Sequence, residues 1–367
     1  MINNLLGSVR NQYQTLNGKQ KRFLGKYFIL INFIMLLIIA FLGERLYTMR
    51  KVEMEWIGER VDRPAPTKEE ITHLSNMPAI DTSIYMMRMS DINMKEKTMQ
   101  VRVVVNLDYA ESNFPDGTPG IGIFNGTLKE QQQVSRRIKN GRVHEILRLT
   151  AEVEPYYMLP MYPLDLELIS VRLSPKVEDD PYYFRLVDFQ DMTYVAQNDY
   201  QLVKTGFVNE VESDVTASLT DSQHQVKYYG LTRAYMLFEH KNVYSYLKTV
   251  QYMLLAISIA LFALLINAKT NSPKNGRVAV IGSSVFALSA TVFQLNASIK
   301  VINALTIIDL FTFYSGLVIL ICFLVTIRTL RLLDEEGYAT AKLFDQIMFI
   351  TIFIYTCIFF IGVYLYA

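Results

Sequence analysis

Polar side chains recur on one face of an apolar stretch that covers residues 278–299. At about 100° per residue, as in an α-helix, a single arc about 100° wide gathers them. The members of this arc are Arg277, Val280, Ser284, Ala287, Thr291, Gln294 and Ser298, and Leu288 lies on its edge. The arc therefore presents hydroxyl and amide groups along an otherwise apolar helix. Such groups suit a water-filled path for ions rather than the making or breaking of bonds.

Two features of this polar face remain open. Small hydroxyl residues also pack against neighbouring helices inside membranes, without any water path. The register of the face is open by one residue, and the alternative register presents Ser283, Phe286 and Ala290. If the face lines a path, Ala287 or Leu288, near mid-helix, forms a hydrophobic constriction that closes by expelling water.

No arrangement of residues is typical of an enzyme. The four histidines are scattered, and none of them forms a pair at metal-ligand spacing: His73, His144, His224 and His240. The sequence has no G-x-S-x-G segment, no phosphate-binding glycine loop and no C-x-x-C pair. Both cysteines, Cys322 and Cys357, lie in apolar runs, so no disulfide framework is expected. We expect no catalytic residues, no metal and no cofactor.

The composition is that of a membrane protein with one sizeable water-facing domain. Of the 367 residues, 51% are hydrophobic and 19% are charged, whereas soluble domains carry about 25% charged residues. A helix needs about 20 apolar residues to cross a bilayer, and five stretches qualify: 27–43, 249–268, 278–299, 301–327 and 346–367. The formal net charge of +1 gives no indication of a nucleic-acid partner.

Basic residues in the short connecting segments predict the orientation. Residues 1–26 form a basic tail without acids, and the segment between the second and third apolar stretches is also basic. Because such segments stay in the cytoplasm, we expect a multi-pass protein of the plasma (inner) membrane with a cytoplasmic N-terminus. The segment 44–248 and the C-terminus then lie outside. Stretch 27–43 is expected to be an uncleaved signal anchor, with a cleaved signal peptide as the alternative.

Residues 78–246 are expected to form an extracytoplasmic antiparallel β-sandwich, reached through a linker or helical approach at 44–77. Strand candidates are rich in β-branched residues and are separated by turn residues: 82–89, 98–107, 134–139, 142–153, 166–173, 182–186, 200–208 and 226–238. Asn140-Gly141 fits a tight hairpin turn, because both residues tolerate positive φ. Strands without a long amphipathic helix between them favour a sandwich.

Four motifs, in order, make residues 78–367 resemble the pentameric ligand-gated ion channels, the Cys-loop receptor-like family, in the prokaryotic type that lacks the loop cysteines. Residues 84–86 through 105–107 resemble the family's first hairpin, and Met161 to Asp165 match its aromatic-Pro-x-Asp loop. Residues 241–246 resemble the basic-x-x-Tyr-x-Tyr stretch before the first channel helix, and 300–309 the link into the third. Departures are the absence of Pro from 249–268 and Asp108-Tyr109 in place of the family's Trp.

The resemblance implies a homo-oligomer, a pentamer, in which residues 247–367 form a four-helix transmembrane channel domain for inorganic ions. The polar face of 278–299 would then line the pore, and Arg277 weakly favours anions. A charge cluster that couples sandwich to pore would correspond to Asp91, Asn93, Asp165 and Lys241. The agonist, a small molecule or a proton, would meet candidate residues Tyr182, Tyr183, Tyr228 and Tyr229.

Two other functions remain open. A permease-like subunit of an ABC exporter also places an outside domain after a first span and follows it with a helical bundle. A non-conducting receptor of channel-like fold is the other alternative. The short link expected at 298–301 favours a channel subunit.

Overall fold

The computed structural model of the chain describes residues 12–61, 77–93, 98–114, 117–157, 164–176, 182–191, 200–216, 225–240, 243–266, 271–298 and 306–366, with Thr72, Glu96 and Met161. The chain divides into two compact units. We call the first the helical unit; it comprises Met1–Val52, Leu159–Leu164 and Val243–Ala367. The second, the sandwich unit, comprises Glu53–Met158 and Asp165–Asn242.

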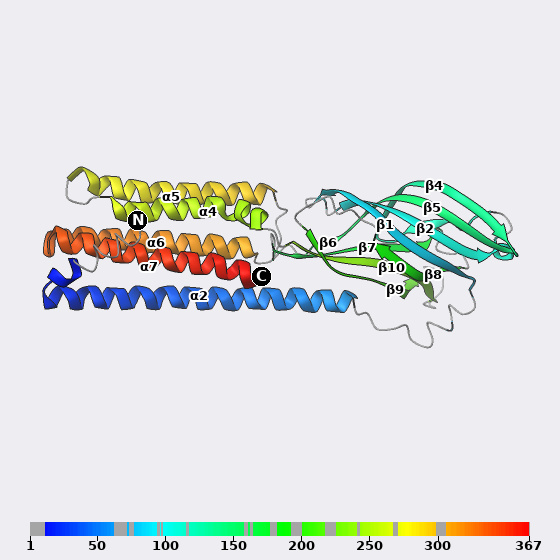
Figure 1. Cartoon of the computed structure of the whole chain (residues 1–367), viewed down its shortest axis with the longest axis horizontal. Helices are drawn as coiled ribbons and strands as arrows, with labels where there is room; N and C mark the ends of the chain where they lie inside the picture. Colours follow the sequence, from blue (N-terminus) through cyan, green and yellow to red (C-terminus); the bar gives the residue numbers. More distant parts are fainter. Residues whose placement is uncertain are drawn as a thin grey trace. The chain divides into compact units, whose positions relative to one another are not determined.

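In the described part of the chain, the helical unit has five long helices (Figure 1): α2 (Gly18–Val61), of which residues 18–52 belong here, α4 (Val243–Leu265), α5 (Asn271–Ser298), α6 (Ile307–Glu335) and α7 (Tyr338–Tyr366). Helix α4 contacts α5, α6 and α7, and α6 contacts α5 and α7. All five helices are long and apolar enough to cross a membrane. The chain is therefore a membrane protein.

The helices do not end where the apolar runs end. Helix α2 continues past the predicted span 27–43 into the segment expected as a linker or helical approach. Helices α6 and α7 are separated only by Glu336 and Gly337, because Gly337 adopts the positive φ of 89° that ends many helices. Helix α5 is described to Ser298, and α6 begins at Ile307, where Thr306 and Asp309 form a reciprocal capping box. The short link expected at 298–301 falls mostly outside the described residues.

Helix α2 begins with a similar device. The Asn17 side-chain oxygen accepts the Gln20 backbone N–H at 2.8 Å, and the Gln20 side-chain oxygen accepts the Asn17 backbone N–H at 3.2 Å. Buried residues then follow along α2 at alternating spacings of seven and four: Leu24, Ile31, Met35, Leu42 and Leu46. This spacing keeps one narrow apolar stripe on the same side of a long helix.

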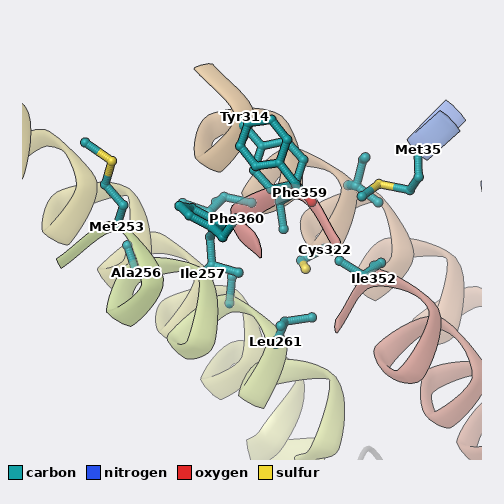
Figure 2. Close-up of a cluster of buried hydrophobic side chains, with 14 of the residues drawn as sticks. Met35, Met253, Ala256, Ile257, Leu261, Tyr314, Cys322, Ile352, Phe359 and Phe360 are labelled. Atoms are coloured by element: carbon teal, nitrogen blue, oxygen red, sulfur yellow. The ribbon is translucent and has the colours of Figure 1, made fainter. Parts of the chain in front are cut away.

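The core of the helical unit collects this stripe together with side chains of α4, α6 and α7. Figure 2 shows part of it, including Met35 of α2, Ile257 of α4 and Phe360 of α7. The rings of Tyr314 and Phe359 stack at 3.9 Å between centroids. Polar contacts also join α2 to the other helices, since the Tyr355 hydroxyl donates to the Asn32 side-chain oxygen at 3.0 Å.

The sandwich unit contains two sheets. The first has the order β4-β5-β2-β1-β8, and the second has the order β3-β7-β10-β9 with β6 paired to β7. The strands are β1 (Ala79–Asn93), β2 (Thr98–Ala110), β3 (Ile121–Ile123), β4 (Gly126–Lys139), β5 (Arg142–Val153), β6 (Tyr156–Tyr157), β7 (Leu166–Pro175), β8 (Tyr183–Asp191), β9 (Tyr200–Thr216) and β10 (Gln225–His240). A short 3₁₀ turn, Glu111–Asn113, follows β2.

The predicted strands and the hairpin turn are present. Buried and less buried residues alternate along β2, and its buried side enters the core between the sheets. Asn140 and Gly141, between β4 and β5, have φ of 56° and 74°, as two-residue hairpin turns require. One expectation needs correction, because β1 and β8 pair in parallel, so the sandwich is not wholly antiparallel.

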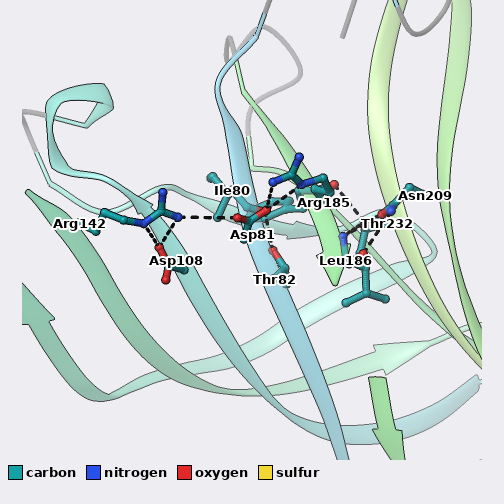
Figure 3. A network of polar contacts seen from close by, with 10 residues as sticks. Ile80, Asp81, Thr82, Asp108, Arg142, Arg185, Leu186, Asn209 and Thr232 are labelled. Atoms are coloured by element: carbon teal, nitrogen blue, oxygen red, sulfur yellow. Dashed lines mark hydrogen bonds and ion pairs between the residues drawn. The ribbon is translucent and has the colours of Figure 1, made fainter. Parts of the chain in front are cut away.

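Polar contacts join neighbouring strands and also join the two sheets (Figure 3). The Asn209 side chain of β9 accepts the Leu186 backbone N–H of β8 at 2.8 Å and the Thr232 hydroxyl of β10 at 2.6 Å, which joins the two sheets. On the first sheet, Asp81 accepts the Arg185 Nε–H at 2.7 Å, and Arg142 pairs with both Asp81 and Asp108. The His144 Nδ1 lies 2.8 Å from Asp108.

The last turns of α2, residues 53–61, belong to the sandwich unit. Ile57 and Val61 pack against Leu168 and Tyr235 of the second sheet. The Glu53 carboxylate accepts the Leu166 backbone N–H at 2.9 Å. The Arg233 guanidinium, fully buried, donates to the Arg60 carbonyl and pairs with Glu210 at 2.8 Å. A cation therefore caps the negative end of this helix.

We predict that Arg233→Met lowers the free energy of unfolding of the sandwich unit by about 3–5 kcal/mol, because it leaves Glu210 buried without its cation. The sole tryptophan, Trp56, lies under Arg60 at 3.8 Å from the guanidinium carbon to the ring centre. Its fluorescence during denaturant unfolding in detergent is a local reporter.

The control is Arg185→Met, whose ion pair with Asp81 is half-exposed and should contribute about 1 kcal/mol or less. The double variant Arg233→Met with Glu210→Met should regain most of the stability. Equal effects of the two arginine substitutions would contradict the capping role.

Candidate functional site

A buried ion pair joins α5 to α7 inside the helical unit. Arg277 of α5 and Asp345 of α7 are 2% and 3% exposed, and Arg277 Nη2 donates to Asp345 Oδ2 at 2.8 Å. The other oxygen of Asp345 accepts the Thr329 hydroxyl of α6. Both oxygens of the carboxylate are thus hydrogen-bonded, as a buried anion requires.

The same guanidinium closes the end of α4. Arg277 Nε donates to the Ile266 carbonyl at 2.8 Å, and Nη2 also reaches the carbonyls of Ile266 and Leu264. These carbonyls lie at the C-terminal end of α4 and have no partner within that helix. A single cation therefore binds α4, α5 and α7 together, where the helix dipole favours positive charge.

This pairing turns the predicted pore face of α5 toward its own bundle. Ser284 and Thr291, on the face of Arg277, are 0% and 4% exposed. Their hydroxyls donate to backbone carbonyls of α5 itself, those of Ile281 at 2.6 Å and Ala287 at 2.8 Å. In the single chain these hydroxyl residues pack against neighbouring helices, which is the alternative to a water path that the sequence left open.

The remaining residues of the predicted face are partly buried up to mid-helix and exposed near its C-terminal end. Val280, Ala287 and Leu288 are half-buried and pack against the core of the helical unit. Gln294 is exposed. The side chain of Ser298 lies outside the described residues.

The opposite face of α5 is exposed. Nine residues at about 100° each place Phe286 about 180° from Arg277, and Phe286 is 79% exposed. Phe293, two turns further on, is 77% exposed, and Ser283 and Ala290 are also exposed. The residues of the alternative register, Ser283, Phe286 and Ala290, thus face away from the bundle of the single chain.

The weak expectation of anion selectivity stays a prediction. It depended on Arg277 as an uncompensated positive ring at a pore mouth. Because Asp345 lies 2.8 Å from the guanidinium, the two formal charges offset each other at this position.

Of the expected coupling cluster, the structure places only Asp165. Its side chain is 0% exposed within the sandwich unit. The side chains of Asp91 and Asn93, and the whole of Lys241, lie outside the described residues. Among the described residues, no two members of the expected charge cluster can therefore be compared in position.

The segment just before Asp165 belongs to the helical unit, although the chain on both sides of it belongs to the sandwich unit. Met161 and Leu164, the described ends of the predicted aromatic-Pro-x-Asp loop, are 0% and 1% exposed. Both lie in the hydrophobic core that also contains Tyr246 and Phe311. The loop thus supplies apolar anchors to the core of the helices.

The agonist candidates do not form a described aromatic group. Tyr182 is buried, donates to the Gly120 carbonyl at 2.6 Å and packs edge-on against Phe114 and Phe184, so it serves the sandwich core. Tyr183 is half-buried in β8. The side chains of Tyr228 and Tyr229 lie outside the described residues.

Tyr109, where the family has a Trp nearby, is also a core residue. It is 1% exposed, and its hydroxyl donates to Glu145 at 2.9 Å. Burial, followed by the hydrogen bond to the Glu145 carboxylate, raises the pKa of the Tyr109 phenol above its usual range. Tyr109 therefore stays neutral and fills the position with an aromatic ring.

Sequence reasoning missed Asp345, because the apolar run was taken to begin at Gln346. The signal that could have found it is an acid at the edge of an apolar stretch, since such residues are costly in membranes and are usually paired. Arg233 and Glu210 were missed as well, because each looks like an ordinary exposed residue of a strand. No group of three His, Cys, Asp or Glu side chains that could hold a metal occurs in the described part of the chain.

No protein-family model and no curated protein matches this chain.

The two faces of α5 predict opposite reactivity of adjacent positions. In a background with Cys357→Ser, we expect a membrane-impermeant or small water-soluble thiol reagent to modify Ser283→Cys and to leave Ser284→Cys unmodified. Ser283 is exposed, whereas Ser284 is fully buried against the bundle. Mass spectrometry of the labelled protein in detergent measures this directly.

The remaining cysteine, Cys322, is fully buried and provides the internal negative control. Modification of Ser284→Cys at the rate of Ser283→Cys would show that α5 is rotated relative to this structure.

Proposed function

We propose that the chain is a subunit of an oligomeric, ligand-gated ion channel, in which the sandwich unit lies outside the cell and controls α5. The four helices α4–α7 form the channel domain, and α2 is an additional N-terminal membrane helix. The resemblance of the sequence motifs to the pentameric ligand-gated channels supports a homopentamer. Inorganic ions are the transported species, and a small molecule or a proton is the agonist.

The observation that carries this proposal is the assignment of residues 159–164 to the helical unit. A change of shape in the sandwich strands that flank this loop would displace Met161 and Leu164, which are buried among the helices. Helix α2 provides a second covalent route, because it contributes residues to both units. A ligand that binds two sandwich conformations unequally could therefore shift the conformation of the bundle.

The exposed face of α5 is the better candidate for the pore wall. Among the four helices of the channel domain, α5 has the smallest share of buried residues in its apolar segment. That share is 22% in α5 and 39% to 56% in the other three. A helix that meets neighbouring subunits and a pore requires such exposure. The exposed phenylalanine Phe286 near mid-helix is then the hydrophobic constriction, which closes the path by expelling water.

A non-conducting receptor is the second candidate, and one observation favours it. The hydrogen-bonding side chains of the polar face are used inside the subunit, by Asp345 and by the α5 backbone. The exposed face has phenylalanine rings that lipid could also cover. In that case the coupling through residues 159–164 would serve signalling without ion flow.

Ion flux decides between these candidates. We expect Phe286→Ala to raise basal flux of ions from liposomes by about tenfold or more, because the smaller side chain widens and wets the constriction. Phe262→Ala on α4 is the matched control, since Phe262 is also exposed, at 60%, but lies on another helix. Fluorescent dyes for protons, monovalent cations and chloride would report the ion.

Purified wild-type protein should form fivefold rings in negative stain. Fivefold rings without flux from either variant would support the non-conducting receptor. Monomers, or a two-fold particle that copurifies with an ATPase, would contradict the channel proposal and favour the ABC permease subunit.

A further inference from the structure

A polar cavity lies beside the buried ion pair of the helical unit. Its volume is about 220 Å³, and its walls come from the end of α4, from Arg277 of α5 and from the start of α7. The polar lining residues are Arg277, Tyr338, Lys342, Asp345 and Gln346. Polar groups that line such a cavity need hydrogen-bond partners, because buried polar groups without partners are costly.

Arg277, which lines the cavity, has a buried nitrogen without a hydrogen-bond partner among the described residues. Arg277 uses Nε and Nη2 for Ile266, Leu264 and Asp345, whereas its Nη1 has no hydrogen-bond partner among the described residues. A guanidinium carries five N–H donors in a rigid fork. Nη1 therefore keeps unused N–H donors on a residue that lines the cavity, and an acceptor can reach them after a small side-chain movement. Arg277 is only 2% exposed.

The charges of the lining favour a monoanion. Arg277 and Lys342 contribute two positive charges and Asp345 one negative charge, which gives a formal net charge of +1 for the described lining. Both oxygens of Asp345 are already occupied by Arg277 and Thr329, so this carboxylate positions the guanidinium rather than acting as a free anion. Lys342 is exposed, and its ammonium can rotate toward a ligand.

The position of the cavity matches the depth of lipid headgroups. Leu264 and Leu265 are the last residues of α4, and Tyr338 is the first residue of α7. Helix ends of a membrane bundle lie near the interface between hydrocarbon and water. Basic pockets between membrane helices at this level hold anionic headgroups.

We propose that this cavity binds a phosphate group, held by Arg277 Nη1 and Lys342. The phosphate group comes from an anionic phospholipid headgroup or from free phosphate. A charge-assisted hydrogen bond from guanidinium to phosphate is among the stronger polar contacts in proteins. By joining the end of α4 to α5 and α7, the bound group would stabilise the packing of these helices, whether or not the chain conducts ions.

The test uses full-length protein in detergent and native mass spectrometry with dioleoyl phosphatidylglycerol and dioleoyl phosphatidylcholine, which share their acyl chains. We expect phosphatidylglycerol to bind more tightly, and Lys342→Gln to weaken that binding roughly tenfold, because it removes one charge-assisted contact. Arg331→Gln is the matched control. Arg331 is an exposed cation near the C-terminal end of α6, which precedes the start of α7. It does not line the cavity.

Free phosphate is the second arm. Inorganic phosphate at millimolar concentration should raise the midpoint of thermal unfolding of wild type and Arg331→Gln but not of Lys342→Gln, if soluble phosphate is the occupant. A phosphatidylglycerol preference without this shift identifies the lipid headgroup. A further variant, Gln346→Leu, changes another residue of the cavity wall and keeps both cations. It should also bind phosphatidylglycerol or phosphate more weakly than the wild type.

Two results would overturn the proposal. One is the absence of both a phosphatidylglycerol preference and a phosphate shift in the wild type. The other is an equal loss of binding in Lys342→Gln and Arg331→Gln, which would show that anions are attracted by surface charge alone. Neither result bears on ion conduction, so this inference and the channel proposal fail separately.

Discussion

The arrangement of the helical unit depends on the hydrogen-bond and charge partners of one arginine near the start of the apolar helix α5. An isolated charge in this environment is costly, and Arg277 avoids the cost by pairing with Asp345 and with the last carbonyls of α4. Because these partners come from different helices, the pair fixes the rotation of α5 about its own axis. The inward direction of Ser284 and Thr291 and the outward direction of Phe286 follow from that rotation.

A comparable constraint acts on α2 in the sandwich unit. The helix has 44 residues, or about 66 Å at 1.5 Å per residue, and its buried positions recur every four or seven residues from Leu24 to Val61. Beyond the apolar run the helix is highly charged, so its last turns need specific partners to remain ordered. Arg233 caps the Arg60 carbonyl and is itself paired with Glu210. Ile57 and Val61 supply apolar contact.

Local signals in the sequence were enough to predict the helices and strands. They were not enough to predict which face of each helix is buried. Alternation along residues 98–107 and the Asn140-Gly141 pair predicted β2 and its neighbouring hairpin, because strand and turn preferences act over a few residues. The apolar runs predicted five helices, but charged turns such as residues 328–335 are helical without being apolar, so the ends were misplaced. The direction in which each face of α5 points depends on Asp345, a residue 68 positions away from Arg277. No periodicity within α5 contains that information.

The two faces of α5 also differ in what their polar groups can still do. On the inward face, both described hydroxyls point to backbone carbonyls of the preceding turn and lie in a dry interior, where they cannot hydrate an ion. On the outward face, Ser283 also bonds to the preceding turn, at 3.0 Å, yet it is exposed, and its oxygen keeps a lone pair for water. Phe286 and Phe293 stand two turns apart on this face, with small residues between them. An assembly that brings several copies of α5 together on this side would therefore alternate wide, wettable levels with narrow aromatic ones. That pattern suits a path that closes by dewetting, because no charge needs to move for the path to open.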